Sequence, residues 1–319
     1  MLPDMLTSVV IPTFRRPDSL ERCLVALSRQ TQQPDEVLVV VRDSDAETHA
    51  FLDRADVQSF ALQRVAVNEP GVVAAMNQGA RAATGEIIAL LDDDTAPFPD
   101  WMERIEKTFI ENPKVGGVGG RDFQAIHPGE AAIVGIVQWQ GRIIGNHHLG
   151  VGTARPVDLL KGANCAYRAE PLRSIGFDVR LTGGGAQVNW ELGLGLAMQR
   201  HGWTLIYDPA IAVDHFVEPR FEGDTTHRGG FNPQGMVDAV HNETLFLWEH
   251  FGMPRRLAFF VWATLIGTRY TPGFSLALLG LLKRDPTALA RMRSTYKGRL
   301  TGIRTAQQSR RNKDSSATS

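Results

Sequence analysis

The stretch IIALLDDDTAPFPDW, residues 87–101, combines a short apolar run with three consecutive aspartates. Residues 86–91 have the near-continuous apolar pattern of a strand that is covered on both faces of a sheet. Asp92, Asp93 and Asp94 come where this strand is expected to end. Neighbouring carboxylates repel one another, so they destabilise the fold unless a cation or a hydrogen-bonded ligand compensates them. The stretch therefore predicts a ligand site at the end of a buried strand.

The surrounding sequence alternates short β-rich runs with helical patterns. The predicted strands are 8–13, 36–41, 63–67, 86–91 and 114–120, and the predicted helices are 16–31, 72–84 and 101–111. Strand, helix and strand at these intervals imply βαβ crossovers, and hence an α/β fold with a mostly parallel, Rossmann-like sheet flanked by helices. In such sheets ligands bind outside the carboxyl ends of the strands, which is where the three aspartates lie.

The second half of the chain is less regular. In order, it predicts an excursion over 122–160, a strand at 162–168, a Gly-rich turn at 182–187, a helix at 188–202, strands at 204–209 and 210–216, a mobile loop at 218–235 and a helix at 236–252. We expect two domains. The first covers residues 1–235, and the second, 236–319, is a helical, amphipathic and basic extension.

Charge is distributed unevenly along the chain. The net charge is −1, but residues 283–319 hold ten Lys or Arg residues against Asp285 and Asp314, a net of +8. Such a basic segment either attaches to anionic lipid headgroups or nucleic acid, or is simply solvated. No interleaved aromatic residues support nucleic-acid binding, so we expect none. The two cysteines, Cys23 and Cys165, are too few for a disulfide framework, which favours a cytoplasmic location.

An apolar stretch precedes the basic segment. Residues 257–282 are interrupted by Arg269 and by the Pro272-Gly273 pair, and each half is shorter than the roughly 20 residues that span a bilayer. Two readings remain open. The stretch makes an interfacial or re-entrant contact with a membrane, or it is a helical pair packed on the domain.

The aspartate triplet itself has two readings. Mg²⁺ and Mn²⁺ prefer oxygen ligands, and one or two carboxylates commonly share Mg²⁺ with substrate phosphates. Alternatively, the aspartates cap a helix and favour the positive end of its dipole. The position at the end of a βαβ strand favours the metal, with Asp92 and Asp94, two residues apart, aimed at one ligand.

Several segments in a fixed order carry a family resemblance. They are SVVIPTFRRPDSLERCLVALSRQT, EVLVVVRDSD, NEPGVVAAMNQGARAATGEIIALLDDDTAPFPDWM, KGANCAYRAEPL and GWTLIYDPAIAVDHF. Over roughly residues 7–216 they resemble a family 2 glycosyltransferase with the GT-A fold. The resemblance implies transfer of a sugar from a nucleotide-diphosphate-sugar donor to an acceptor hydroxyl, usually with inversion, and a divalent metal, Mg²⁺ or Mn²⁺, as cofactor.

The resemblance also assigns roles at matching positions. On the nucleotide and diphosphate side it places Pro12, Thr13, Phe14, Arg16, Asp43, Gly71, Asn77, Asp92 and Asp93. Asp92, Asp94 and His215 match the metal ligands, and Asp93 is expected to turn away or to support the loop. Arg42 and Met76 depart from the pattern, because relatives often have Asp and Arg there. The departure at Arg42 leaves the base of the nucleotide open.

The catalytic base departs from the pattern as well. Relatives often read E-D-x-D/E-L before the Gly-Trp pair, whereas residues 188–192 here are Val-Asn-Trp-Glu-Leu. Asn189 stands in place of the usual catalytic Asp and is not a useful proton acceptor. Glu191 is the nearest carboxylate, but it faces the donor only if the helix starts late or its first turn is irregular. Asp178 is the next candidate.

The sequence thus predicts an inverting, metal-dependent glycosyltransferase, peripheral on the cytoplasmic face of the inner membrane. Its acceptor is a glycan or a lipid-linked sugar, and its oligomeric state is open. One alternative is a catalytically inactive nucleotide-sugar-binding scaffold, which Asn189 supports. A second is a sugar-nucleotide pyrophosphorylase, which the missing glycines in PTFRRPDS disfavour.

Overall fold

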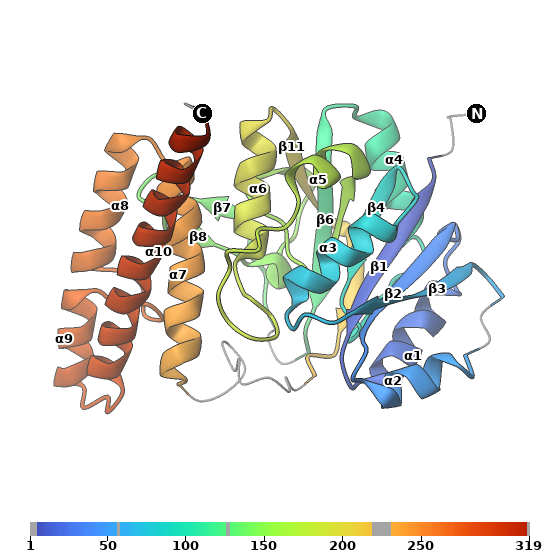
Figure 1. Ribbon diagram of the computed structural model, residues 1–319, viewed down its shortest axis with the longest axis horizontal. Helices are drawn as coiled ribbons and strands as arrows, with labels where there is room; N and C mark the ends of the chain where they lie inside the picture. The colour runs from blue at the N-terminus through green and yellow to red at the C-terminus, as the bar shows by residue number, and fades with distance from the viewer. Residues whose placement is uncertain (1–4, 56–57, 126–127, 219–230, 318–319) are drawn as a thin grey trace. The chain divides into compact units, whose positions relative to one another are not determined.

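The computed structural model describes residues 5–55, 58–125, 128–218 and 231–317 and divides into two compact units (Figure 1). The sheet unit comprises Met1–Ile136, Ile144–Phe177 and Leu194–Glu218, and the helical unit comprises Val137–Ile143, Asp178–Gly193 and Pro219–Ser319. The two units are interleaved along the chain, because 137–143 and 178–193 group with the C-terminal helices. Whether residues 1–235 fold as a separate domain stays a prediction. The predicted mobile loop, 218–235, lies largely outside the described residues.

The sheet unit is built on a mixed, mostly parallel sheet. Its strands run in the order β3-β2-β1-β4-β10-β6-β11-β5, with β9 paired to β11. The strands are β1 (Thr7–Thr13), β2 (Glu36–Arg42), β3 (Ala61–Val67), β4 (Ile87–Leu91), β5 (Thr95–Pro97), β6 (Val115–Phe123), β9 (Arg155–Val157), β10 (Asn164–Arg168) and β11 (Thr204–His215). β1 to β4 are parallel, as are β6 and β11, whereas β10 runs antiparallel to both β4 and β6. The α/β fold with a mostly parallel sheet is therefore confirmed.

Helices cover both faces of this sheet, which explains why its strands are apolar throughout. Val9 and Ile11 of β1 belong to a buried cluster with α1 (Pro17–Leu27) and α4 (Trp101–Glu111). Val10 points the other way, because side chains alternate along a strand. There α3 (Val72–Ala82) packs so closely that a Cβ added at Gly79 would lie 2.3 Å from Val10.

β11 brings a distant part of the chain to the end of β4. The sequence predicts two strands over 204–216, but the structure has one strand, with an irregularity between Asp208 and Val213. After this irregularity β11 pairs with β5, so that His215 lies opposite Thr95. The same segment pairs Val213 with Asp122 at the end of β6. A bulge bends a strand and re-aims its side chains, and here it carries His215 to the residues that follow β4.

The helical unit contains α7 (Pro233–His250), α8 (Met253–Leu265), α9 (Phe274–Leu282) and α10 (Ala288–Ala317). α10 packs closely on α7 at two glycines. A Cβ at Gly298 or Gly302 would lie 2.6 Å from the backbone oxygen of Val237 or His241, respectively. Among the described residues, no helix is both long and apolar enough to cross a bilayer.

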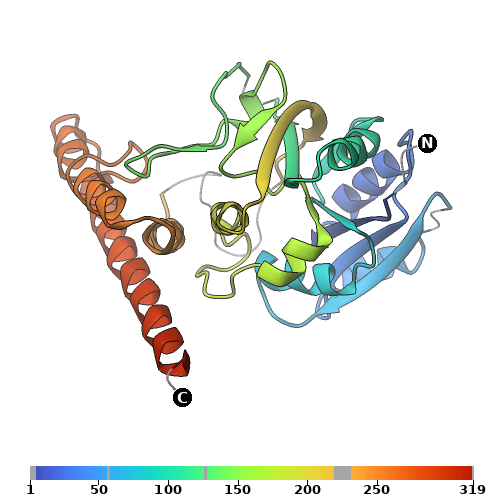
Figure 2. The same cartoon turned by 90° about the horizontal axis from the view of Figure 1, so that it is seen from above.

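The remaining elements are short or span both units. They are α2 (Ala46–Leu52), α5 (Ala169–Ile175), α6 (Trp190–Arg200), β7 (Ile136–Val137), β8 (Ile143–Ile144) and the 3₁₀ turn η1 (His147–Leu149). Figure 2 shows the same elements from above. Neither α2 nor α5 is predicted from the sequence, since both are only seven residues long.

An ion pair buried between α7 and α10 gives a stability prediction. Arg299 Nη1 lies 3.3 Å from Glu243 Oε1, and burial raises the pKa of Glu243 and lowers the pKa of Arg299. Arg299→Met leaves the Glu243 carboxylate, whose side chain is only 18% exposed, without its cation, so we expect it to lower the free energy of unfolding by about 3–5 kcal/mol. Urea denaturation followed by circular dichroism measures this. The double variant with Glu243→Gln should recover most of the loss, and a double variant as unstable as the single one would contradict the account.

Candidate active site

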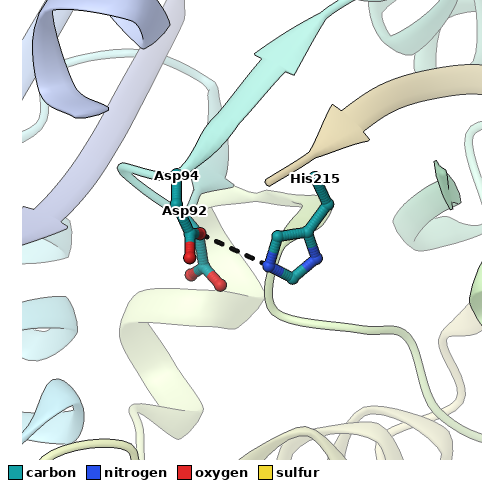
Figure 3. A group of neighbouring side chains, drawn as sticks. All are labelled: Asp92, Asp94 and His215. Atoms are coloured by element: carbon teal, nitrogen blue, oxygen red, sulfur yellow. Dashed lines mark ion pairs between the residues drawn. The ribbon is translucent and has the colours of Figure 1, made fainter. Parts of the chain in front are cut away.

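Three side chains gather where β4 and β11 end. Asp92 and Asp94 follow β4, and His215 is the last residue of β11. One ligand atom from each lies within 4.8 Å of those of the other two. His215 Nε2 is 3.3 Å from Asp94 Oδ1, and Figure 3 shows the imidazole ring facing the paired carboxylates. Asp94 and His215 are buried and Asp92 is half-buried, so the cluster is open on the Asp92 side.

Asp93 lies outside this cluster and holds the end of β1. Its carboxylate accepts hydrogen bonds from Thr13 Oγ1 at 2.8 Å and from Arg16 Nη1 at 2.9 Å. Burial raises the pKa of Asp93 to about 7; Asp94 and Asp92 add to this, and Arg16 opposes it. Asp93 therefore joins the first strand to the triplet.

Behind His215 lie two charged residues, Asp122 and Lys161, whose role the sequence did not predict. Asp122, at the end of β6, places Oδ2 3.1 Å from His215 Nδ1 and forms an ion pair with Lys161. Burial opposes the charge on Asp122, but the hydrogen bonds from His215 and Lys161 outweigh it and lower its pKa. For His215, burial disfavours the cation, yet Asp122 and Asp94 raise its pKa to about 9. The ring is thus fixed with Nε2 directed at Asp94.

Asp122 was detectable by the rule that identified Asp92. It comes two residues after the predicted apolar, Gly-rich strand 114–120 and lies at the carboxyl end of β6. Lys161 had no comparable signal, because it lies in an irregular segment far along the chain.

A pocket of about 540 Å³ adjoins His215. It is lined by residues from the ends of β6 and β11 and from the segment after β6: Arg121, Phe123, Gln124, Ala125, Pro128, Gly129, His148, Asp214, His215, Phe216 and Val217. Phe123 stacks on Phe98, with ring centroids 5.7 Å apart, and Arg121 lies over the Phe123 ring. The pocket therefore offers both an aromatic wall and polar groups next to the cluster.

The residues assigned to the nucleotide side lie at the ends of β1 and β2 and at the start of α3. Pro12 and Thr13 end β1, and the ring of Phe14 stacks against Arg42, 4.3 Å from the guanidinium carbon. Asp43 is exposed directly after β2. These groups share the carboxyl edge of the sheet, as the predicted topology requires.

Gly71 and Asn77 have clear structural roles. Gly71 precedes α3 with φ of 107°, a conformation that favours glycine. The Asn77 amide donates to the Phe177 carbonyl at 2.9 Å and accepts from the Phe177 N–H at 3.0 Å. Contact of either residue with a nucleotide stays a prediction.

The helix that carries Glu191 starts later than the sequence predicts. The predicted helix is 188–202, whereas α6 begins at Trp190 and Asn189 has φ of 74°. Glu191 is half-buried in the first turn. The condition that the sequence sets for Glu191, a late helix start, is therefore met. Glu191 belongs to the helical unit, as does Asp178, whereas the Asp-Asp-His cluster belongs to the sheet unit.

Asn189 has a structural partner within the helical unit. Its Nδ2 donates to the Ala239 carbonyl of α7 at 2.9 Å. A carboxylate has no hydrogen to donate there. This bond gives a physical reason for an amide at the position where relatives have a catalytic Asp.

A buried asparagine of α7 holds the turn that precedes α6. Asn242 is fully buried; its Oδ1 accepts from the Thr182 N–H at 2.9 Å, and its Nδ2 donates to the carbonyls of Thr182 and Val188. Both ends of the Gly-rich turn are therefore bound to one side chain. α7 fixes the turn from which α6, with Glu191, begins.

Asp178 is engaged in an ion-pair network. Its carboxylate accepts from the Arg180 backbone N–H at 2.9 Å and pairs with the Arg180 guanidinium. Arg180 also binds Glu249 of α7 and Ser309 of α10. Taking a proton would break the Asp178–Arg180 pair, so the geometry favours Glu191 over Asp178 as the candidate base.

The cluster fits a divalent cation. Two carboxylates and one imidazole suit Mg²⁺ and Mn²⁺, which bind oxygen ligands, and Mn²⁺ also accepts nitrogen. A carboxylate behind the other nitrogen of a histidine is the common support of a metal-bound imidazole, and Asp122 supplies it. Asp92, Asp94 and His215 would hold the ion.

Comparison with known proteins gives the same picture. The model of the family "Glycosyl transferase family 2" matches residues 8–175, more than half of the chain. The chain is 31% identical over 119 residues to the glucosyl-dolichyl phosphate glucuronosyltransferase of Haloferax volcanii, which is 36% of this chain and 38% of the relative. It is 32% identical over 127 residues to the hyaluronan synthase of Pasteurella multocida, 38% of this chain and 13% of the relative. The chain thus matches less than half the length of these relatives.

Solved structures share the fold across almost the whole chain. S. aureus TarS in complex with UDP-GlcNAc has a TM-score of 0.59 at 14% identity, and the match covers 97% of this chain and 92% of that chain. The mannosyltransferase PcManGT from Pyrobaculum calidifontis, in complex with GDP-Man and Mn²⁺, has a TM-score of 0.52 at 18% identity, with 96% and 88% covered. These likenesses show the GT-A-like fold. Together, the family match, the fold and the Asp-Asp-His cluster at the carboxyl edge of the sheet lead to one conclusion: the chain belongs to glycosyl transferase family 2.

Proposed function

We propose that this protein transfers a glycosyl group from a nucleoside-diphosphate sugar to an acceptor hydroxyl, with inversion and with a divalent cation. The observation that carries the proposal is the cluster of Asp92, Asp94 and His215, backed by Asp122, at the sheet edge where α/β folds bind ligands. The family match, which covers β1 to β10, supports a nucleotide-sugar donor.

Different residues in and around the cluster bind different parts of the donor. A bound dication would stabilise the negative charge that develops on the leaving diphosphate. Arg16, whose Nη1 is 3.6 Å from Asp94 Oδ2, lies where a phosphate oxygen can also be bound. Asp92, the most accessible of the three aspartates, binds the ribose side, and Pro12, Thr13, Phe14 and Asp43 border the nucleotide. Mg²⁺ and Mn²⁺ both suit this ligand set.

Inversion needs a base that takes the proton of the acceptor hydroxyl as it attacks the anomeric carbon. We assign this role to Glu191, at the start of α6. The segment from Thr182 to Val188, bound at both ends by Asn242, sets where α6 begins. Asn189 cannot serve, because its amide is not a useful proton acceptor and donates to α7.

We propose a lipid-linked sugar or a growing polysaccharide as the acceptor, and the cytoplasmic face of the inner membrane as the location. The names of the two relatives, a glucosyl-dolichyl phosphate glucuronosyltransferase and a hyaluronan synthase, support these two acceptor classes. The family match leaves no reason to retain a sugar-nucleotide pyrophosphorylase.

The experiment is donor turnover without acceptor. The purified protein is incubated with a panel of UDP-, GDP- and dTDP-sugars, with Mn²⁺ or with EDTA, and released nucleoside diphosphate is measured. We expect slow hydrolysis of one donor, and we expect this hydrolysis to require the cation. Addition of lipid-linked and oligosaccharide acceptors should then accelerate release. Metal-dependent binding with no turnover on any donor would support the inactive scaffold instead, and no binding of any donor would refute the proposal.

A further inference from the structure

The helical unit exposes a large apolar face on α8 and α9. On these two helices and at Ile266, which caps α8, eleven large apolar side chains are between 42% and 74% exposed: Met253, Leu257, Phe260, Val261, Leu265, Ile266, Phe274, Leu278, Leu279, Leu281 and Leu282. We call them the α8–α9 apolar face. Soluble proteins rarely expose contiguous apolar patches larger than a few hundred Å², and larger ones mark interaction sites.

The two helices present these side chains with the same spacing. Met253, Leu257, Phe260 and Val261 of α8 follow the pattern i, i+4, i+7, i+8. The residues of α9 repeat it at Phe274, Leu278, Leu281 and Leu282. At 100° per residue this pattern lies on one side of a helix. The inward sides are separate, since Phe259, Ala263 and Ala277 are buried. Each helix therefore has one apolar side packed in the unit and a second apolar side in solvent.

The link between the helices is a closed turn. Gly267 has φ of 70°, Gly273 N–H donates to the Ile266 carbonyl at 2.8 Å, and Thr268 and Thr271 bond each other. Ser275 Oγ also donates to the Leu265 carbonyl. These backbone groups already have hydrogen-bond partners, so contact with an apolar phase does not leave them unsatisfied. In Figure 1, α8 and α9 follow one another along α10.

The charges of this region have one sign. From His250 to Arg284 the sequence has no Asp or Glu, but it has Arg255, Arg256, Arg269, Lys283 and Arg284. Arg269, in the turn, and Lys283 and Arg284, at the end of α9, are exposed. Basic residues near an anionic lipid surface contribute about 1 kcal/mol each.

α10 adds a basic stripe. Arg293, Lys297, Arg304 and Arg311 are exposed and follow the spacing i, i+4, i+11, i+18, which keeps them on one side of the helix. The opposite side holds Gly298 and Gly302, which pack on α7. The stripe is therefore a row of cations on the side of α10 away from α7, with the exposed Leu300 between Lys297 and Arg304.

We propose that the α8–α9 apolar face docks the protein on an anionic bilayer as a monotopic, interfacial helix pair, with the exposed cations contacting lipid headgroups. Side chains such as Phe260 and Leu282 enter the headgroup–acyl boundary, while Arg269, Lys283 and Arg284 stay at its surface. The strength of interfacial binding scales with the apolar area that is buried and with the attraction of cations to anionic lipids, and this region offers both. The proposal names the surface through which the enzyme of the preceding section would reach a membrane acceptor, but it does not depend on catalysis.

The test is co-sedimentation of the full chain with vesicles of phosphatidylcholine alone and of phosphatidylcholine mixed with phosphatidylglycerol. We expect binding to the mixed vesicles, weaker binding to the neutral ones, and weakening by salt. The triple variant Leu257→Ser, Leu278→Ser, Leu282→Ser should lower the partition coefficient at least about tenfold. Replacing Arg293, Lys297 and Arg304 by Gln should reduce binding to the anionic vesicles and not to the neutral ones.

The matched control carries Leu6→Ser, Val25→Ser and Ile133→Ser, three exposed apolar residues of the sheet unit. It should bind as the wild type does, and circular dichroism should show that both triple variants are folded. Equal binding by the two triple variants would overturn the proposal. The proposal would also be overturned if the wild type did not bind vesicles and instead formed a dimer through this face. In that case the wild type and the control would have the mass of a dimer, and the α8–α9 triple variant would have the mass of a monomer. A protein that does not bind vesicles can still turn over donor in solution, so the membrane-docking proposal and the proposed function are tested separately.

Discussion

Asp94→Asn is expected to lower metal-dependent donor turnover about a thousandfold, equivalent to about 4 kcal/mol of transition-state stabilisation. Asp94 is the buried carboxylate of the Asp-Asp-His cluster, 3.3 Å from His215 Nε2, and a neutral amide there is a poor ligand for a hard dication. The protein should stay folded, because removing one of three adjacent carboxylates relieves repulsion. Released nucleoside diphosphate measures turnover, and thermal unfolding measures stability.

The matched control for this variant is Asp100→Asn. Asp100 lies in the same stretch of sequence, but it pairs with Arg104 on the surface of α4. It should turn over donor like the wild type. Unchanged turnover in Asp94→Asn would contradict the assignment of the cluster, as would equal losses in the two variants.

Glu191→Gln is expected to slow transfer to the acceptor by about a hundred- to ten-thousandfold, since a positioned base contributes that much. Binding of donor and metal should not change, because the variant keeps the shape of α6 and leaves the cluster intact. The kcat for transfer falls while the KM for donor stays. Glu170→Gln, a first-turn acid of α5, is the matched control.

Asn189→Asp separates this account from the family pattern. If the family pattern alone determined which residue is the catalytic base, Asp at position 189 would raise the rate of transfer. The structure predicts the opposite, since a carboxylate at 189 would face the Ala239 carbonyl without a hydrogen to donate. We expect a loss of about 1–3 kcal/mol in stability and no gain in rate. A more active Asn189→Asp, together with an unaffected Glu191→Gln, would move the base to position 189.

Local pattern predicted the sheet and the position of its site. β1, β2 and β4 have apolar runs that both faces of a sheet require, and Asp92 to Asp94 follow the last of them. What the sequence did not show depends on non-local pairing. Asp122 supports His215 only because an irregularity in β11 re-registers that strand against β5 and β6. No local sequence pattern predicts how β11 is registered against β5 and β6.

The helical unit was harder to predict for a related reason. The sequence predicts a helical, amphipathic and basic extension over 236–319, but it does not show what holds α10 to α7. The structure shows close backbone approach at Gly298 and Gly302 and the Arg299–Glu243 pair. The role of Asn189 was also invisible, because its partner, Ala239, lies fifty residues away on α7.

Mn²⁺ titration followed by electron paramagnetic resonance tests the central claim most directly. The signal of free Mn²⁺ falls when the ion binds, so the titration counts bound ions with and without a nucleoside diphosphate. The account predicts one Mn²⁺ per chain, bound more tightly with the nucleotide, lost in Asp94→Asn and kept in Asp100→Asn. Nucleoside diphosphate that binds equally well in EDTA, or Mn²⁺ binding that survives Asp94→Asn, would contradict it.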